Sequence, residues 1–236
     1  MVELNGALRL HPALRREVLQ VGRERSPVLV IDDFLSDPQV LIDFAAAHCE
    51  FRGDVDPFYP GVRAVIPQIY SFAVRAFLGQ WIAEAFSLAG TAVVRERSHF
   101  SLVTTRPEQL LPLQRVPHFD NTDDRHLAVL HYLSPESQGG TSFYRHRATD
   151  FEVILPQRLA AHTESRDREL EHPPAARYID GDTAEYERIG SIEGRFNRLI
   201  VYKGLCLHSA DIAGACNFSS DPRRGRLTAN TFLVYR

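Results

Sequence analysis

Residues 199–209 read LIVYKGLCLHS, an apolar run followed by a turn and a histidine. The run Leu199–Tyr202 is typical of a buried β-strand, because largely apolar residues stand together in a short segment. His208 comes a few residues later, after Gly204. We therefore expect its imidazole at the rim of a β-structure. Cys206, two residues before it, is interpreted as a small buried thiol.

The sequence on both sides of this stretch also favours strands, with helices only near the N-terminus. Strands are predicted at residues 27–31, 99–104, 127–133, 141–144, 197–203 and 226–234. Helices are predicted over residues 38–49 and 70–88, the first after the capping sequence Ser36-Asp37-Pro38. Residues 52–65 contain Pro57, Pro60 and Gly61, which predict a loop.

This pattern predicts a single domain over residues 1–236 that is mainly β with flanking α-helices. Residues 1–92 would supply supporting strand and helices. Residues 93–236 would form a double-stranded β-helix core of the jelly-roll or cupin-like kind. The polar segment 156–185 is longer than an ordinary connection between strands. We interpret it as either a surface helix with flexible flanks or a lid.

The bulk composition excludes several classes of protein. Hydrophobic residues make up 44% of the 236 residues and charged residues 24%, which is ordinary for a globular domain. The formal net charge of −3 gives no reason to expect a nucleic-acid or membrane partner. No signal peptide or membrane-spanning segment is recognisable, so we expect a cytoplasmic protein. Its partner would be a small molecule or peptide, and the oligomeric state stays open.

A candidate metal site combines His208 with His118-Phe119-Asp120. His118 and Asp120 are two residues apart, so on an extended segment both side chains leave the same face. Two imidazoles and one carboxylate form the facial triad that binds Fe(II) and leaves coordination positions open. The alternative is that His118 and Asp120 belong to a turn, with His208 a structural histidine.

The last predicted strand begins with a candidate anion site, Arg226-Leu227-Thr228. The guanidinium of Arg226 and the hydroxyl of Thr228 would lie on one face, which suits a carboxylate ligand. Arg223 and Arg224 are alternatives for the same role. We favour Arg226 because it begins the alternating strand, whereas the other two precede Gly225.

Three further stretches carry a resemblance to a known family. They are residues 129–134 (VLHYLS), 139–144 (GGTSFY) and 197–202 (NRLIVY). With the order His118-x-Asp120, His208 and Arg226-x-Thr228, they resemble the prolyl-hydroxylase-like branch of the Fe(II)/2-oxoglutarate-dependent oxygenase superfamily. The resemblance extends over about residues 28–235. Within that superfamily, the chain resembles a bacterial family in particular.

The resemblance implies a function and roles for individual residues. His118, Asp120 and His208 would bind Fe(II), and 2-oxoglutarate and O₂ would be cosubstrates. Arg226, Thr228 and Tyr132 would contact the distal carboxylate of 2-oxoglutarate. The expected activity is hydroxylation of an amino acid, a peptidyl residue or another small polar substrate, with release of succinate and CO₂.

Two other functions are compatible with the same residues. One is a non-catalytic β-helix domain that binds a ligand or partner. The other is a cupin-like metalloenzyme that does not use 2-oxoglutarate, for which Arg226-x-Thr228 has no explanation.

Overall fold

The computed structural model of the chain describes residues 4, 6–53, 58–212, 214 and 216–236. Its strands are β1 (Arg15–Val21), β2 (Ser26–Asp32), β3 (Arg52–Gly53), β4 (Gly61–Val65), β5 (Val93–Val103), β6 (His126–Tyr132), β7 (Gly140–His146), β8 (Tyr186–Ile192), β9 (Leu199–Lys203), β10 (His208–Asp211) and β11 (Arg226–Tyr235). Its α-helices are α1 (Gln39–His48), α2 (Gln68–Phe86) and α3 (Leu159–Glu169). Short 3₁₀ helices lie at η1 (Pro107–Gln109), η2 (Pro112–Arg115) and η3 (Pro156–Arg158).

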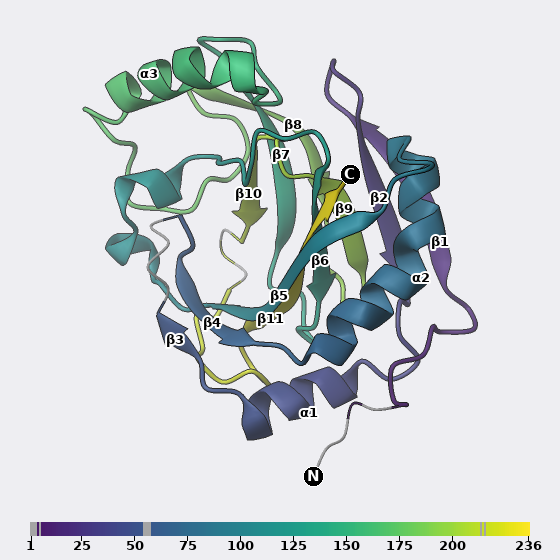
Figure 1. Cartoon of the computed structure of the whole chain (residues 1–236). Helices are drawn as coiled ribbons and strands as arrows, with labels where there is room; N and C mark the ends of the chain where they lie inside the picture. The colour runs from purple at the N-terminus through teal and green to yellow at the C-terminus, as the bar shows by residue number, and fades with distance from the viewer. Residues whose placement is uncertain (1–3, 5, 54–57, 213, 215) are drawn as a thin grey trace.

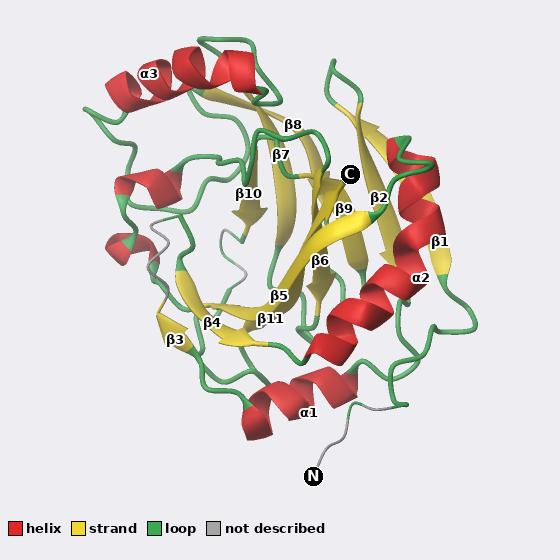
Figure 2. Ribbon diagram, viewed as in Figure 1, coloured by secondary structure: helices red, strands yellow, loops and turns green. Residues whose placement is uncertain are grey.

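The strands form two antiparallel sheets (Figures 1 and 2). The large sheet has the order β1-β2-β9-β6-β11-β5-β4-β3, and the small sheet has the order β10-β7-β8. Helix α2 lies along the large sheet and contacts β2 and β5, and buried side chains of α1 belong to the same core. The predicted class, mainly β with flanking helices, is confirmed.

Alternation along the strands divides the buried side chains between two layers. Leu199 and Val201 of β9 belong to the core shared with α1 and α2. Ile200 and Tyr202 of the same strand belong to a second core that also contains Phe143 of β7. The second core therefore lies between the two sheets, and the large sheet has one face toward the helices and one inner face.

The register of β5 and β11 fixes which residues share the inner face. Thr228 pairs with Ser101 of β5 and with Tyr132 of β6. Further along the strands, Phe232 pairs with Arg97, and Val234 pairs with Arg95. Residues at this spacing point to the same side of a sheet. The inner face thus extends from Arg226 near one end of the strands to Arg95 near the other.

The prediction of a loop over residues 52–65 was wrong at its two ends. Residues Arg52–Gly53 form β3, and Gly61–Val65 form β4, which pairs with β5. The first residue of β4 is a glycine, Gly61, and a Cβ atom at this position would collide with the carbonyl oxygen of Leu102. Residues 54–57 lie outside the described part of the chain.

The segment 156–185, predicted as a surface helix or a lid, contains α3, and this helix packs against other parts of the chain. His162 of α3 is fully buried, and its ring lies edge-on to Phe119. Glu169 at the end of α3 is 2.9 Å from His146 Nε2 of β7. These contacts join α3 to the small sheet and to the segment between His118 and Asp120.

Residues 1–92 form helices α1 and α2 and contribute strands β1 to β4 to the large sheet. In the part of the chain that the structure describes, no helix combines the length and apolar character needed to cross a bilayer.

Candidate metal and cosubstrate site

Backbone hydrogen bonds bring the three predicted metal ligands together. His118 and His208 form an isolated antiparallel bridge. The backbone nitrogen of each residue donates to the carbonyl oxygen of the other, with N···O distances of 2.9 and 2.8 Å. The N–H of Asp120 donates to the carbonyl of Gly204 at 2.7 Å, beside the turn that precedes His208. Segments about 90 residues apart in the chain are therefore held side by side by main-chain contacts.

The geometry of His118, Asp120 and His208 fits a single metal ion. One ligand atom from each side chain lies within 4.8 Å of the other two. His118 Nε2 is 4.0 Å from Asp120 Oδ1, and His208 Nε2 is 3.9 Å from Asp120 Oδ2. Two imidazoles and one carboxylate in this arrangement are the facial donor set of non-haem Fe(II) sites.

The surroundings of both imidazoles suit metal binding. Nδ1 of His208 lies 2.9 Å from the carbonyl of Cys206, which only accepts, so Nδ1 carries the proton and Nε2 presents its lone pair. Burial, followed by the neighbouring His208 and Arg63, holds the pKa of His118 well below its ordinary value. The low pKa of His118 and the hydrogen bond at His208 Nδ1 are therefore both compatible with binding of a metal ion through the imidazoles.

A cavity of about 90 Å³, the inner cavity, joins this triad to the predicted anion site. Its wall includes all three candidate ligands together with Arg226 and Thr228. Arg226 and Thr228 are almost fully buried, at 5% and 2% exposure. The structure therefore brings together five of the six site residues that the sequence predicted.

Arg226 is a buried cation with an incomplete set of partners. Its Nη2 donates to the carbonyl of Gly140 at 2.8 Å, and its guanidinium lies 5.8 Å from the centre of the Tyr132 ring. Within the described residues, its Nε has no hydrogen-bond partner and no carboxylate forms an ion pair with it. A buried unpaired cation is costly, so an anionic ligand is the expected occupant.

Tyr132, the sixth predicted residue, has a different position from the other five. Its hydroxyl bonds to the Thr141 hydroxyl at 2.7 Å, and it packs beside Arg226 without lining the inner cavity. Thr141 and Tyr202 line the cavity instead, and neither was singled out from the sequence. Alternation along the strand 199–203 places Tyr202 on the same face as Ile200, and this pattern could have identified Tyr202 as a cavity residue.

The two alternative arginines do not line the inner cavity. Arg223 and Arg224 are exposed on the turn before β11, and Arg223 is 3.4 Å from Asp43. Of the three arginines considered for the anion site, Arg226 is the one that the structure places beside the triad.

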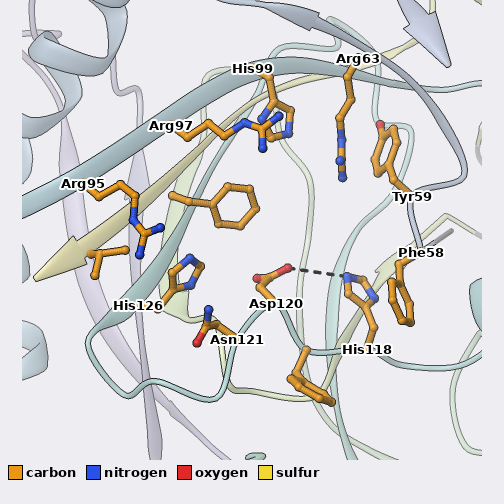
Figure 3. Close-up of a pocket in the computed structure, with 13 residues that line it drawn as sticks. Phe58, Tyr59, Arg63, Arg95, Arg97, His99, His118, Asp120, Asn121 and His126 are labelled. Carbon is orange, nitrogen blue, oxygen red and sulfur yellow. Dashed lines mark ion pairs between the residues drawn. The ribbon is translucent and has the colours of Figure 1, made fainter. Parts of the chain in front are cut away.

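A second cavity of about 430 Å³, the outer cavity, opens on the other side of His118 and Asp120 (Figure 3). Phe58, Tyr59, Arg63 and Phe232 line both cavities together with these two residues. The outer cavity adds three residues of β5, namely Arg95, Arg97 and His99, as well as His126 of β6. None of these basic side chains was predicted as part of the site.

Several solved structures are similar to this chain at low sequence identity. The carbocyclase SnoK of nogalamycin biosynthesis, a non-haem α-ketoglutarate-dependent protein, has a TM-score of 0.50 at 16% identity, covering 89% of this chain and 80% of that one. The corresponding epimerase SnoN has a TM-score of 0.46 at 13% identity, covering 90% and 78%. A prolyl-4-hydroxylase from Pseudomonas putida has a TM-score of 0.38 at 14% identity, covering 84% and 99%.

The likeness to SnoK shows the fold, and the predicted double-stranded β-helix is confirmed. No curated protein matches the sequence. Residues 12–233, nearly the whole chain, match the model described as "Family of unknown function (DUF6445)", and the chain therefore belongs to the DUF6445 family.

Proposed function

We propose that this protein is a non-haem Fe(II)- and 2-oxoglutarate-dependent dioxygenase. It hydroxylates an amino acid, a peptidyl residue or another small polar substrate and releases succinate and CO₂. The fold supports this proposal, since it is shared with a protein named as α-ketoglutarate-dependent.

One observation carries the proposal further than the fold does. The buried guanidinium of Arg226 and the His118-Asp120-His208 triad line the same inner cavity. A facial triad alone fits many metalloproteins. A buried cation in the same cavity, with no carboxylate partner in the described part of the chain, specifically fits a ligand that is both a metal chelator and an anion. 2-Oxoglutarate has both properties.

The residues present fit the two absent groups. His118, Asp120 and His208 would bind Fe(II), and Arg226 would pair with the distal carboxylate of 2-oxoglutarate. The Thr228 hydroxyl lies on the same face and would donate to that carboxylate. With 2-oxoglutarate and O₂, the iron supplies the oxidising chemistry. The chain contributes orientation of the ligands and a largely buried cavity that limits access of water.

The class of substrate and the cytoplasmic location remain part of the proposal. The preference for an amino acid or peptidyl residue rests on the resemblance of residues 129–134, 139–144 and 197–202 to prolyl-hydroxylase-like sequences. A fold hosts many reactions, so the substrate must be argued from the site itself.

Succinate formation tests the proposed activity. The purified protein, supplied with Fe(II), 2-oxoglutarate and O₂, should release succinate slowly without substrate, and omission of either Fe(II) or 2-oxoglutarate should stop this release. His118→Ala should be inactive. If the protein binds Fe(II) but neither binds nor consumes 2-oxoglutarate, the cupin-like or the non-catalytic function replaces this proposal.

A further inference from the structure

The outer cavity has a row of basic residues on one strand. Arg95, Arg97 and His99 are at alternate positions of β5, and all three line the cavity. Figure 3 shows the guanidinium groups of Arg95 and Arg97 on the cavity side of this strand, with Asp120 facing them from the opposite wall. The row therefore begins at the outer end of the inner face and extends toward the candidate metal ligands.

The two arginines have no counter-charge in the described part of the chain. No ion pair joins Arg95 or Arg97 to any described carboxylate, and Asp120 is the one described carboxylate on the cavity wall. Asp120 belongs to the metal triad, so it is already committed to another cation.

Two buried arginines outside the cavities do have carboxylate partners. Arg145 pairs with Glu152 at 2.6 Å, and Arg198 pairs with Asp32 at 2.6 Å. The chain thus places carboxylates beside arginines that support the fold. At Arg95 and Arg97, two like charges face one cavity, an arrangement that an anionic ligand stabilises.

Two aromatic rings in the wall of the cavity are stacked against its histidines. Phe232 is stacked against His99 and His126, with ring centroids 5.8 and 5.5 Å apart. Phe58 is stacked on His118 at 6.3 Å. The middle of the cavity is therefore suited to an apolar or planar part of a ligand, and its volume of about 430 Å³ is that of a small-molecule site.

From this arrangement we infer that the substrate is a small molecule with a phosphoryl or carboxylate group, which Arg95 and Arg97 bind. The remainder of the molecule lies across Phe232, and the position to be oxidised lies at His118 and Asp120. Guanidinium groups bind both kinds of anion through paired N–H donors. This inference rests on the proposed function, and it names the class of substrate for that same site.

Binding of simple anions to a redox-inert complex tests the inference. The protein is loaded with Zn(II) in place of Fe(II) and saturated with 2-oxoglutarate, so that the anion site at Arg226 is filled. Phenyl phosphate, phenylacetate and the neutral benzyl alcohol are then titrated by calorimetry. The double variant Arg95→Gln/Arg97→Gln is compared with Arg9→Gln/Arg168→Gln, which removes two exposed arginines outside both cavities.

We expect the Arg95→Gln/Arg97→Gln protein to bind at least one of the two anions about tenfold more weakly than the wild type does. The control variant should bind like the wild type, and benzyl alcohol should not distinguish the three proteins. The anion that loses more affinity identifies the phosphoryl or the carboxylate class. Arg95 and Arg97 are exposed, so both double variants should melt at the wild-type temperature.

Equal anion affinity in the wild type and Arg95→Gln/Arg97→Gln would overturn the inference, and so would an equal loss of affinity in the control variant. If Zn(II) and 2-oxoglutarate bind while the anions do not, the substrate class is wrong and the proposed function stands. If the anions bind through Arg95 and Arg97 but Zn(II) and 2-oxoglutarate do not, the basic pocket stands and the proposed function is wrong.

Discussion

At the scale of single residues, His208 shows how the backbone orients a candidate metal ligand. The carbonyl of Cys206, two residues earlier, accepts from Nδ1 and leaves Nε2 directed toward Asp120. Cys206 itself is buried in the core between the sheets, and burial raises the pKa of its thiol to about 12. The cysteine beside the metal site therefore acts through its main chain and is not a ligand candidate.

Arg226 provides the sharpest prediction for a single side chain. Arg226→Ala should weaken 2-oxoglutarate binding by about 2–5 kcal/mol, because it removes one partner of a buried charge pair. This corresponds to at least about a 30-fold increase in Kd. Metal binding should be retained, since Arg226 is not among the ligands. Calorimetric titration of the Zn(II)-loaded variant measures the effect.

Arg224→Ala is the matched control, because Arg224 is exposed two residues before Arg226 and lines neither cavity. A large loss in the Arg224 variant, with little change in the Arg226 variant, would show that the anion site has been placed at the wrong arginine.

The candidate ligands could be predicted from the sequence, whereas the basic row could not. His118, Asp120 and His208 stand out because metal ligation requires particular residue types at particular spacings. Arg95 and Arg97 lie on a strand that was predicted to begin only at residue 99. Alternation assigns such residues to a common face, but it does not say which face is inside.

At the scale of elements, α3 is a packed helix whose removal should destabilise the protein. Deletion of residues 160–175 would remove buried His162 and the contact of Glu169 with His146. It would also remove the His162 ring that supports Phe119, which stands between two candidate metal ligands in the sequence. We expect a clear fall in the thermal unfolding midpoint, measured by circular dichroism, together with weaker metal binding. An unchanged midpoint with altered substrate handling would instead show that this segment is a lid.

The strands that the sequence did not predict share a physical character. β4 follows Pro57 and Pro60 and begins at a glycine, so the sequence around its start is typical of a turn. β1 is exposed along most of its length at the edge of the large sheet, and β8, at the edge of the small one, contains charged and small residues and has few buried side chains. Such strands are stabilised mainly by main-chain pairing, which leaves a weak signal in side-chain type.

At the scale of the whole molecule, a buried histidine links stability to pH. His131 is fully buried between Tyr70 and Asn197, and burial lowers its pKa from 6.5 to about 4. Between these values the unfolded chain binds a proton and the folded chain does not. The free energy of unfolding should therefore fall as the pH drops from about 6.5 to about 4, by up to about 3 kcal/mol from this residue.

Urea unfolding at pH 7 and pH 4.5 measures this loss. His162 also has a pKa lowered to about 4 by burial, so the wild type has more than one such contribution. His131→Gln should lose less stability between the two pH values than the wild type, whatever its stability at pH 7. An equal loss in both proteins would show that protonation of His131 does not contribute.

The arrangement of the whole sheet was beyond prediction from residue patterns alone. β11, the last strand, lies between β5 and β6, and β2 pairs with β9 across most of the sequence. Pairing of this kind depends on complementary surfaces of distant segments, which local periodicity does not specify. The strand pattern predicted a double-stranded β-helix as the class of fold, but it did not specify which strands pair.

The most direct test of the central proposal is an anaerobic titration. Fe(II) and then 2-oxoglutarate are added to the metal-free protein, and the visible absorption spectrum is recorded. The proposal predicts the weak metal-to-ligand charge-transfer band of the Fe(II)–2-oxoglutarate chelate, present in the wild type and absent in His208→Ala. Bound iron without this band in the wild type would contradict the proposal.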